Sequence, residues 1–235
     1  MKAVVLAAGK GVRMLPLTED RPKVLVEVLG KPFLWYVLNS LREAGIMEVL
    51  LIVGYKKEKV EEFVAGLGKT LPGMKITTVE QKEQLGTGNA TALAKAFANS
   101  EPFLSLNGDN LYSPRDLEEM VKEKGNCVAG IEVENPEKYG VLVMDGERLA
   151  KIMEKPKEAP SKLVNAAAYV FTSDIFDALE RVGMSERGEF EVTDAITILA
   201  KEGKVKVYKI KDYWKDLGKK EDIPAMEAFL KKHGH

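Results

Sequence analysis

The clearest chemical signal in the sequence is a glycine-rich segment close to its start. Gly9 and Gly11 follow a short apolar run, and the cations Arg13 and Lys23 come shortly after them. Glycines allow backbone N–H groups to approach phosphate oxygens closely, and fixed cations stabilise the phosphate charge. The segment therefore predicts a binding site for a phosphorylated ligand.

Two common nucleotide-binding loops do not match this segment. A dinucleotide-binding loop needs a third glycine, but Met14 stands at that position and Pro16 follows it. Pro16 would disturb the tight helix start that holds a pyrophosphate in such loops. A P-loop needs Gly-Lys followed by Ser or Thr, and the segment has no such sequence. The phosphate site must therefore be of another kind.

Two aspartates that are far apart in the sequence are candidates for holding a metal ion. Asp109 comes just after the apolar run 103–106, so we expect it at the carboxyl end of a strand, where open α/β sheets bind ligands. Asp216 lies two residues after Trp214. Two carboxylates together with phosphate oxygens suit Mg²⁺. If both hold one ion, the segment around Trp214 must fold back beside the strand that ends before Asp109.

Residue counts argue against histidine and cysteine chemistry. The sequence has two histidines, His233 and His235, and one cysteine, Cys127. Histidines at a chain end rarely form a catalytic site, and a single cysteine forms neither an intramolecular disulfide nor a cysteine-based zinc site. The sequence also has no Gly-x-Ser-x-Gly motif, which argues against an α/β-hydrolase. Any catalysis would use Asp, Glu, Lys, Arg, backbone amides or a metal bound by oxygen.

The overall charge and hydropathy narrow the range of partners. Among 235 residues, 35 are Lys or Arg and 36 are Asp or Glu, giving a net charge of −1. This balance gives no support for nucleic acid or an anionic membrane as a partner. The sequence has neither an apolar stretch of about 18 residues nor a signal-peptide pattern, so we expect a cytoplasmic protein.

Strand and helix patterns alternate over the first half of the chain and change in the second half. In the first half, the apolar patterns predict strands at 2–8, 49–53, 76–79 and 103–106, and helices within 33–41, 57–67 and 88–97. In the second half, they predict strands at 127–133, 141–144, 149–153, 164–171 and 205–210, and helices at 173–182, 191–202 and 220–232. We expect an α/β, Rossmann-like fold with a mixed, mostly parallel sheet flanked by helices and with a β-rich, lid-like portion.

Several motifs resemble those of the sugar-1-phosphate nucleotidyltransferases, also called nucleoside-diphosphate-sugar pyrophosphorylases. The opening segment Leu-Ala-Ala-Gly-x-Gly-x-Arg-x-x-Pro-Leu-Thr, which begins at Leu6, resembles the start of that family. Further segments agree in order along the chain, and they are Glu83–Ala90, Asn107–Asn110, Tyr139–Val141, Glu154–Pro156, Asn165–Ala166, Glu189–Asp194 and Trp214–Gly218. The resemblance extends from residue 1 to about residue 230. It implies a stand-alone domain over 1–235, with a nucleotide-binding half (1–125) and a sugar-binding half (126–235) that contains the lid.

The resemblance implies a reaction and a role for each motif residue. An oxygen of a sugar 1-phosphate would attack the α-phosphorus of a nucleoside triphosphate and release pyrophosphate. Arg13 and Lys23 would be catalytic, through positioning and charge stabilisation. The other implied roles are nucleotide binding by Leu6, Ala7, Ala8, Gly9, Gly11, Gln81, Gly86 and Thr87, sugar-phosphate binding by Gly140, Glu154, Lys155 and Asn165, and Mg²⁺ binding by Asp109 and Asp216.

The sequence leaves the exact substrates open. The Gln81 amide can both donate and accept, which suits the edge of a pyrimidine base. We therefore expect UTP with glucose 1-phosphate or N-acetylglucosamine 1-phosphate, and the alternatives are dTTP or GTP with another sugar phosphate, or a non-catalytic regulatory subunit that binds a nucleotide sugar. The sequence departs from the family pattern at Val12, Asn89 and Lys219. Whether the chain forms a homo-oligomer is also left open.

Overall fold

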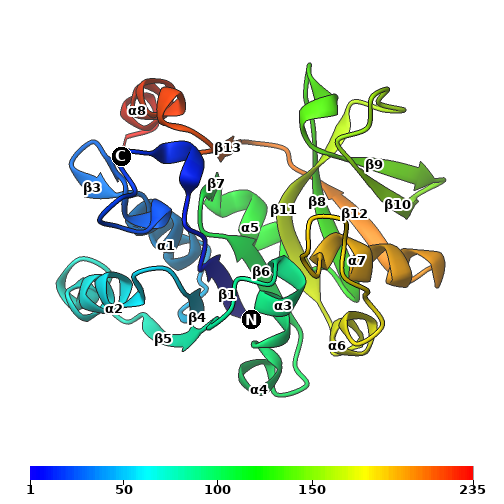
Figure 1. The fold of residues 1–235 in the computed structure, drawn as a ribbon, viewed down its shortest axis with the longest axis horizontal. Helices are drawn as coiled ribbons and strands as arrows, with labels where there is room; N and C mark the ends of the chain where they lie inside the picture. The colour runs from blue at the N-terminus through cyan, green and yellow to red at the C-terminus, as the bar shows by residue number, and fades with distance from the viewer. Residues whose placement is uncertain (235) are drawn as a thin grey trace.

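The structure, a computed structural model, describes residues 1–234, and its central feature is a nine-stranded sheet (Figure 1). From one edge to the other, the strands are β5 (Lys75–Glu80), β4 (Glu48–Val53), β1 (Lys2–Ala7), β6 (Phe103–Asn107), β11 (Leu163–Phe171), β8 (Asn126–Glu132), β12 (Val205–Lys209), β10 (Arg148–Glu154) and β9 (Gly140–Asp145). The first four are parallel to one another, as are β8 and β12. The remaining neighbours pair antiparallel. The α/β fold with a mixed sheet is therefore confirmed.

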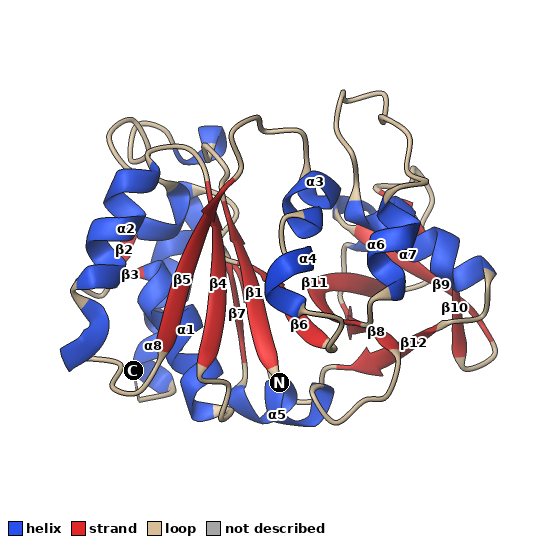
Figure 2. Cartoon of the chain, turned by 90° about the horizontal axis from the view of Figure 1, so that it is seen from below, coloured by secondary structure: helices blue, strands red, loops and turns tan. Residues whose placement is uncertain are grey.

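Helices pack on both faces of this sheet (Figure 2). One face carries α1 (Phe33–Glu43), α2 (Lys57–Ala65), α5 (Pro114–Met120) and α8 (Ile223–Lys232). The other face carries α3 (Thr87–Ala92), α4 (Lys95–Ala98), α6 (Asp174–Leu179) and α7 (Val192–Lys201). A separate apolar cluster fills each of the two layers between helices and sheet.

The first strand illustrates why the sequence forms a sheet that is covered on both sides. Side chains alternate between the two faces of a strand. Val5 packs into the apolar cluster under α1, whereas its neighbour Val4 packs into the cluster on the opposite face. Both side chains are fully buried. The unbroken apolar run at the start of the chain is thus typical of a central parallel strand.

Four features of the fold differ from the expected elements. The single helix expected at 88–97 is two short helices, because the Leu93 and Ala94 N–H groups donate to carbonyls three residues back instead of four. The fold also contains α5 and two short pairs of strands, which were not predicted from the sequence. The pairs are β2 (Glu27–Val28) with β3 (Lys31–Pro32), and β7 (Asn110–Tyr112) with β13 (Trp214–Asp216). Segments of two or three residues are too short to produce a recognisable pattern.

The two halves of the chain share one sheet. β6 from the first half pairs with β11 from the second half along four residues, from Phe103 to Leu106. The division into a nucleotide-binding half and a sugar-binding half stays a prediction. None of the helices within residues 1–234 has the length and apolar character that a membrane span requires.

Candidate active site

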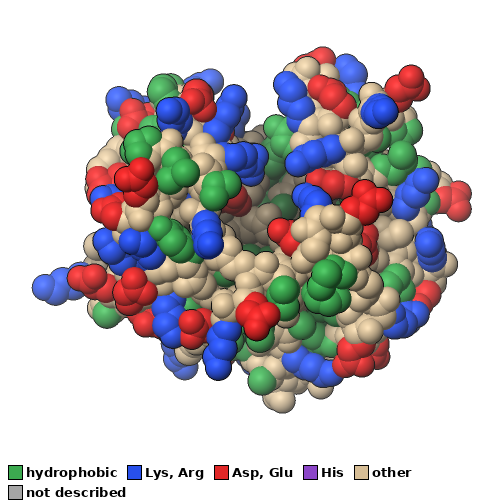
Figure 3. Space-filling view, in the orientation of Figure 1, with side chains coloured by type: hydrophobic (Ala, Val, Ile, Leu, Met, Phe, Trp, Pro, Cys, Tyr) green, Lys and Arg blue, Asp and Glu red, His purple; other side chains and the backbone are tan. Residues whose placement is uncertain are grey.

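Two adjoining cavities open where β1 and β6 end, and Figure 3 shows the cleft between the two lobes of the molecule in which they lie. Their volumes are about 230 Å³ and about 610 Å³. Four residues line both cavities, namely Thr87, Asn107, Asp109 and Glu189. A ligand that extended from one cavity into the other would therefore pass Asp109.

Most residues that the sequence analysis assigned to nucleotide binding line the smaller cavity. They are Leu6, Ala7, Ala8, Gly9, Gln81, Gly86 and Thr87, and Lys23 lies with them. Gly11 lines neither cavity. Its φ of +66° favours glycine, and a Cβ atom there would lie 2.6 Å from Cβ of Lys23. Gly11 thus lets the loop cross closely over Lys23, a packing role that the glycine pattern alone did not indicate.

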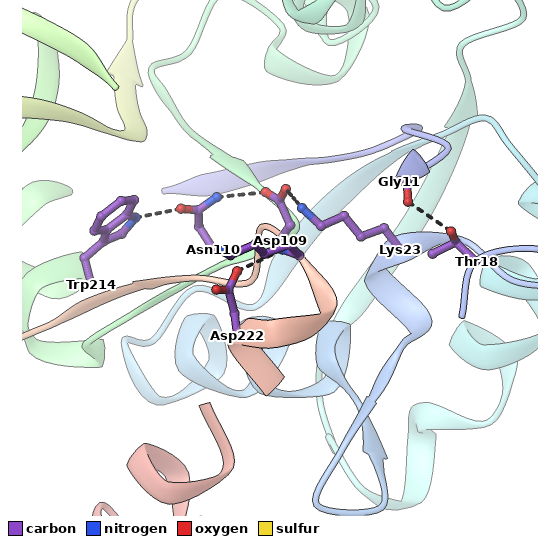
Figure 4. Close-up of polar contacts among 8 residues, drawn as sticks. Gly11, Thr18, Lys23, Asp109, Asn110, Trp214 and Asp222 are labelled. Atoms are coloured by element: carbon purple, nitrogen blue, oxygen red, sulfur yellow. Dashed lines mark hydrogen bonds and ion pairs between the residues drawn. The ribbon is translucent and has the colours of Figure 1, made fainter. Parts of the chain in front are cut away.

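Lys23 and Asp109 form an ion pair at the junction of the two cavities (Figure 4). The Lys23 Nζ atom lies 2.6 Å from Oδ2 of Asp109. The lysine side chain is 9% exposed, so water screens this pair weakly. Arg13, the other predicted catalytic cation, lines the larger cavity together with Asp109. The structure therefore brings both cations to one region of the cleft.

Asp216 lies beside Asp109, as a shared metal site requires. β13 pairs with β7 so that Asp216 stands opposite Asn110, and the Leu217 N–H donates to the carbonyl oxygen of Asp109 at 2.9 Å. Burial, followed by the charge of Asp109, raises the pKa of Asp216 to about 6, while Lys23 and Arg13 oppose this shift. The segment around Trp214 does fold back beside the end of β6.

The donor set at this point fits a Mg²⁺ ion that also binds phosphate. Within residues 1–234, no group of three or more His, Cys, Asp or Glu side chains could hold a metal ion. Two neighbouring carboxylates can still supply part of a Mg²⁺ shell, because this ion usually binds one or two carboxylates together with phosphate oxygens and water. Asp109 and Asp216 would therefore hold the ion together with a bound substrate.

Gln81 forms part of the wall of the smaller cavity and is held firmly there. Its Nε2 atom donates to the Gly86 carbonyl at 3.0 Å and to Oδ1 of Asn89 at 2.9 Å, and the residue is 6% exposed. Gly86 has a φ of +95°, and a Cβ atom there would lie 2.6 Å from the carbonyl oxygen of Phe190. The loop before α3 therefore requires glycine and packs directly on the segment before α7.

The Thr87 hydroxyl group links α3 to the first residue of α7. Oγ1 of Thr87 accepts a hydrogen bond from the Val192 N–H at 3.1 Å, at the first residue of α7. This N–H is one of the groups that a helix start leaves without a partner inside the helix. The predicted nucleotide-binding residue therefore also fixes the position of α7 beside the larger cavity.

The four residues predicted to bind the sugar phosphate line the larger cavity, and they are Gly140, Glu154, Lys155 and Asn165. The Asn165 side chain is fixed in place, since Nδ2 donates to the Tyr169 hydroxyl at 2.8 Å and Oδ1 accepts from the Ala167 N–H at 2.9 Å. The Lys155 ammonium lies 3.9 Å from Oε1 of Glu154 and remains half exposed. The structure thus places these side chains where a ligand in the larger cavity would meet them.

The sequence analysis missed Arg187 and Tyr169, which also line the larger cavity. Arg187 pairs with Glu191, with Nη2 2.6 Å from Oε1. Burial raises the pKa of Glu191, and the Arg187 charge opposes that shift. Arg187 lies in a loop just before a glycine, and no motif in the surrounding sequence indicated that it binds a ligand. Tyr169 lies in β11, and the apolar sequence of this strand predicts only that its side chains are buried in the core.

Three further residues line neither of the two cavities. Asp194 lines a separate hollow with Arg181 at the outer side of α7, and Lys10 lines another with Tyr55. His233 stacks on the Phe229 ring at 4.0 Å between centroids, at the end of α8. His235 lies outside the described residues.

Comparison with known proteins identifies the family to which the chain belongs. The family model described as Nucleotidyl transferase matches residues 2–233, so the chain belongs to the nucleotidyl transferase family. The resemblance noted in the sequence is confirmed.

Two curated relatives are similar over nearly the whole chain. The bifunctional protein GlmU of Methanocaldococcus jannaschii is 43% identical over 231 residues, which cover 98% of this chain and 54% of that protein. The bifunctional sugar-1-phosphate nucleotidylyltransferase/acetyltransferase of Sulfurisphaera tokodaii is 41% identical over 93% of this chain and 53% of its own length. The chain spans about half the length of these curated relatives.

Solved structures have the same fold. A UDP-glucose pyrophosphorylase complexed with UDP-glucose superposes with a TM-score of 0.88 at 28% identity, and the match covers 98% of both chains. A putative glucose-1-phosphate thymidylyltransferase from Bacillus anthracis superposes with a TM-score of 0.86 at 28% identity, over 97% of this chain and 94% of that one.

Proposed function

We propose that this protein transfers a nucleotidyl group from a nucleoside triphosphate to a sugar 1-phosphate, giving a nucleoside diphosphate sugar and pyrophosphate. One observation carries the proposal. Arg13, Lys23, Asp109 and Asp216 line a cleft in which two cavities meet. Such a set of charges suits the meeting of two phosphorylated substrates, whose mutual repulsion is the main obstacle to reaction.

The chemistry requires orientation and charge stabilisation from the protein. The sugar phosphate is already an anion, so its oxygen can attack the α-phosphorus without a general base, and the bond from that phosphorus to the leaving pyrophosphate breaks. Lys23 would stabilise charge at the α-phosphoryl group, and Arg13 would clamp the leaving phosphates with its planar fork. Mg²⁺ bound at Asp109 and Asp216 would neutralise part of the phosphate charge.

The smaller cavity supports a preference for a base with a ring N–H donor. Both hydrogens of the Gln81 amide are used by Gly86 and Asn89, so Oε1 is the atom left to accept a hydrogen bond from a ligand. In uracil and thymine the ring nitrogen N3 carries a hydrogen and can donate to this oxygen. In cytosine the same nitrogen carries no hydrogen and can only accept. UTP is therefore the leading nucleotide, and dTTP and GTP are the alternatives.

The larger cavity supports a neutral sugar. The carboxylates Glu154, Glu189 and Glu191 line this cavity, and they would repel an additional acidic group on the sugar. Carboxylates and the Asn165 amide suit hydroxyl donors. Glucose 1-phosphate and N-acetylglucosamine 1-phosphate are the leading partners of UTP, in line with the relatives named above.

A regulatory subunit that only binds a nucleotide sugar is the rival function. Such a protein would have little use for Arg13 and Lys23 on the pyrophosphate side. Assay of released pyrophosphate, with four nucleoside triphosphates each tested against several sugar 1-phosphates and Mg²⁺, distinguishes the two functions. Turnover with at least one pair is expected, and nucleotide-sugar binding without turnover by any pair would favour the rival.

A further inference from the structure

The side chain of Asn110, the first residue of β7, connects Asp109 in the preceding turn with β13, the strand that carries Asp216. Its Nδ2 atom donates to Oδ1 of Asp109 at 2.8 Å, and its Oδ1 atom accepts from the Trp214 indole N–H at 2.7 Å (Figure 4). Asn110 is 4% exposed, so both hydrogen bonds are sheltered from water. A buried amide with two short hydrogen bonds has one well-defined orientation.

The chemistry of the two partners determines which way the amide faces. An indole N–H can only donate, so the amide oxygen must face Trp214. The NH₂ group is then directed at Asp109, whose ionised carboxylate can only accept. If the indole N–H were absent, the amide would lose the contact that selects this orientation.

The pairing of β13 with β7 places the Asn110 hydrogen bonds beside both Asp109 and Asp216. Residues two apart in a strand point to the same side, so Trp214 and Asp216 share one face of β13. Asp216 stands opposite Asn110 in the pairing with β7. Oδ1 of Asp109 is held by Asn110, while Lys23 occupies Oδ2. The ring of Tyr139, which lines the larger cavity, packs edge-on against Trp214 with centroids 5.6 Å apart.

We propose that Asn110 is a positioning residue for the metal site, and that Trp214 sets its orientation through the indole N–H. The inference rests on the proposed function, because that function assigns a metal ion to Asp109 and Asp216. Asn110 holds Asp109 through Nδ2 and holds the strand that carries Asp216 through Oδ1. Contacts of this kind typically change metal affinity by about 10-fold to 100-fold when they are removed.

The test measures the affinity of the full chain for Mn²⁺, used as a probe for the metal alone, by calorimetric titration. Asn110→Leu removes both hydrogen bonds, and Trp214→Phe removes only the indole donor. Trp35→Phe is the matched control, since Trp35 lies on α1 under the ammonium of Lys31, which is 3.7 Å from its ring centre. The thermal midpoint of each metal-free variant is measured in parallel.

We expect the Mn²⁺ dissociation constant to rise by about 10-fold or more in Asn110→Leu and Trp214→Phe, and to stay at the wild-type value in Trp35→Phe. The double variant should bind no more weakly than Asn110→Leu, because both substitutions break one chain of contacts. An unchanged dissociation constant in Trp214→Phe, with or without a lower thermal midpoint, would overturn the inference. The inference would also be overturned if the dissociation constant of the double variant rose by the product of the two single increases.

Pyrophosphate release by the same preparations separates this inference from the proposed function. Wild-type protein that binds Mn²⁺ but releases no pyrophosphate from any substrate pair would contradict the proposed function, while the affinities of the variants would still decide the role of Asn110. Wild-type protein that turns over while the variants keep wild-type Mn²⁺ affinity would contradict the positioning role alone.

Discussion

Lys23 and Asp109 are 86 positions apart in the sequence, yet the lysine ammonium lies 2.6 Å from the aspartate carboxylate. Each charge thus satisfies the other at the point where the cavities meet. Asp109 would help to hold a Mg²⁺ ion, and the Lys23 ammonium would contact a substrate phosphate. The ion pair therefore fixes the positions of both charges where the cavities meet.

Removal of either cation should reduce turnover far more than stability. We expect Lys23→Ala and Arg13→Ala each to lower kcat by about 10²–10³-fold, as loss of a preorganised electrostatic contact does elsewhere. Lys122→Ala is the control, because Lys122 lies just after α5 and pairs with the exposed carboxylates of Glu118 and Glu119. Pyrophosphate release measures the effect. Near-normal rates in either cleft variant would contradict the roles assigned to these cations.

Base selection should depend on Gln81. The wild-type protein is expected to use UTP more efficiently than CTP or ATP, whose bases lack this ring N–H, and Gln81→Ala should narrow these two differences, since the oxygen that accepts from the ring N–H is lost. Values of kcat/KM for the four nucleotides with one sugar phosphate measure the preference. If the wild-type protein used CTP and UTP with equal efficiency, the assignment of Gln81 to the base would lose its support.

Activity should require a divalent cation and both aspartates. Chelation should abolish turnover and added Mg²⁺ should restore it, because the ion neutralises the two carboxylates and the substrate phosphates. Asp109→Asn should increase the Mg²⁺ concentration needed for half-maximal rate strongly, and Asp216→Asn similarly or somewhat less. Asp177→Asn, at an exposed position on α6, should leave the requirement unchanged. Full activity in the presence of a chelator would argue against the metal site.

Cys127 should be inert in the folded protein. Burial raises the pKa of its thiol from about 9 to about 12, so almost no thiolate exists at pH 8. Because the folded-state pKa is the higher one, the unfolded thiol ionises first as the pH rises, and the group destabilises the fold only above about pH 9. Alkylation at pH 8 should be slow in buffer and fast in denaturant. Rapid alkylation of the native protein would show that the thiol is accessible.

The sequence predicted the central strands well because their residues are apolar on both faces. A run such as that from Ala3 to Leu6 has few alternatives to a buried parallel strand. The site residues predicted from the motifs, other than Gly11, line the two adjoining cavities, since the ends of parallel strands meet at one edge of a sheet. Local composition and strand order together determined those positions.

Contacts between distant segments could not be predicted in the same way. The pairing of β7 with β13 involves three residues on each side, and the bond from Trp214 to Asn110 depends on the position of both strands. Arg187 enters the cleft from a segment whose residues Glu189 and Phe190 pack against Gly86. None of these relationships leaves a periodic pattern in the sequence.

The central claim is that two phosphorylated substrates react in this cleft, and one experiment tests it most directly. Wild-type protein is incubated with UTP and Mg²⁺, with and without a sugar 1-phosphate, and both pyrophosphate and nucleoside diphosphate sugar are quantified over time. We predict that the two products form in equal amounts, and only when both substrates are present. Pyrophosphate formed at the same rate without the sugar phosphate, or no product from any sugar 1-phosphate tested, would contradict the account.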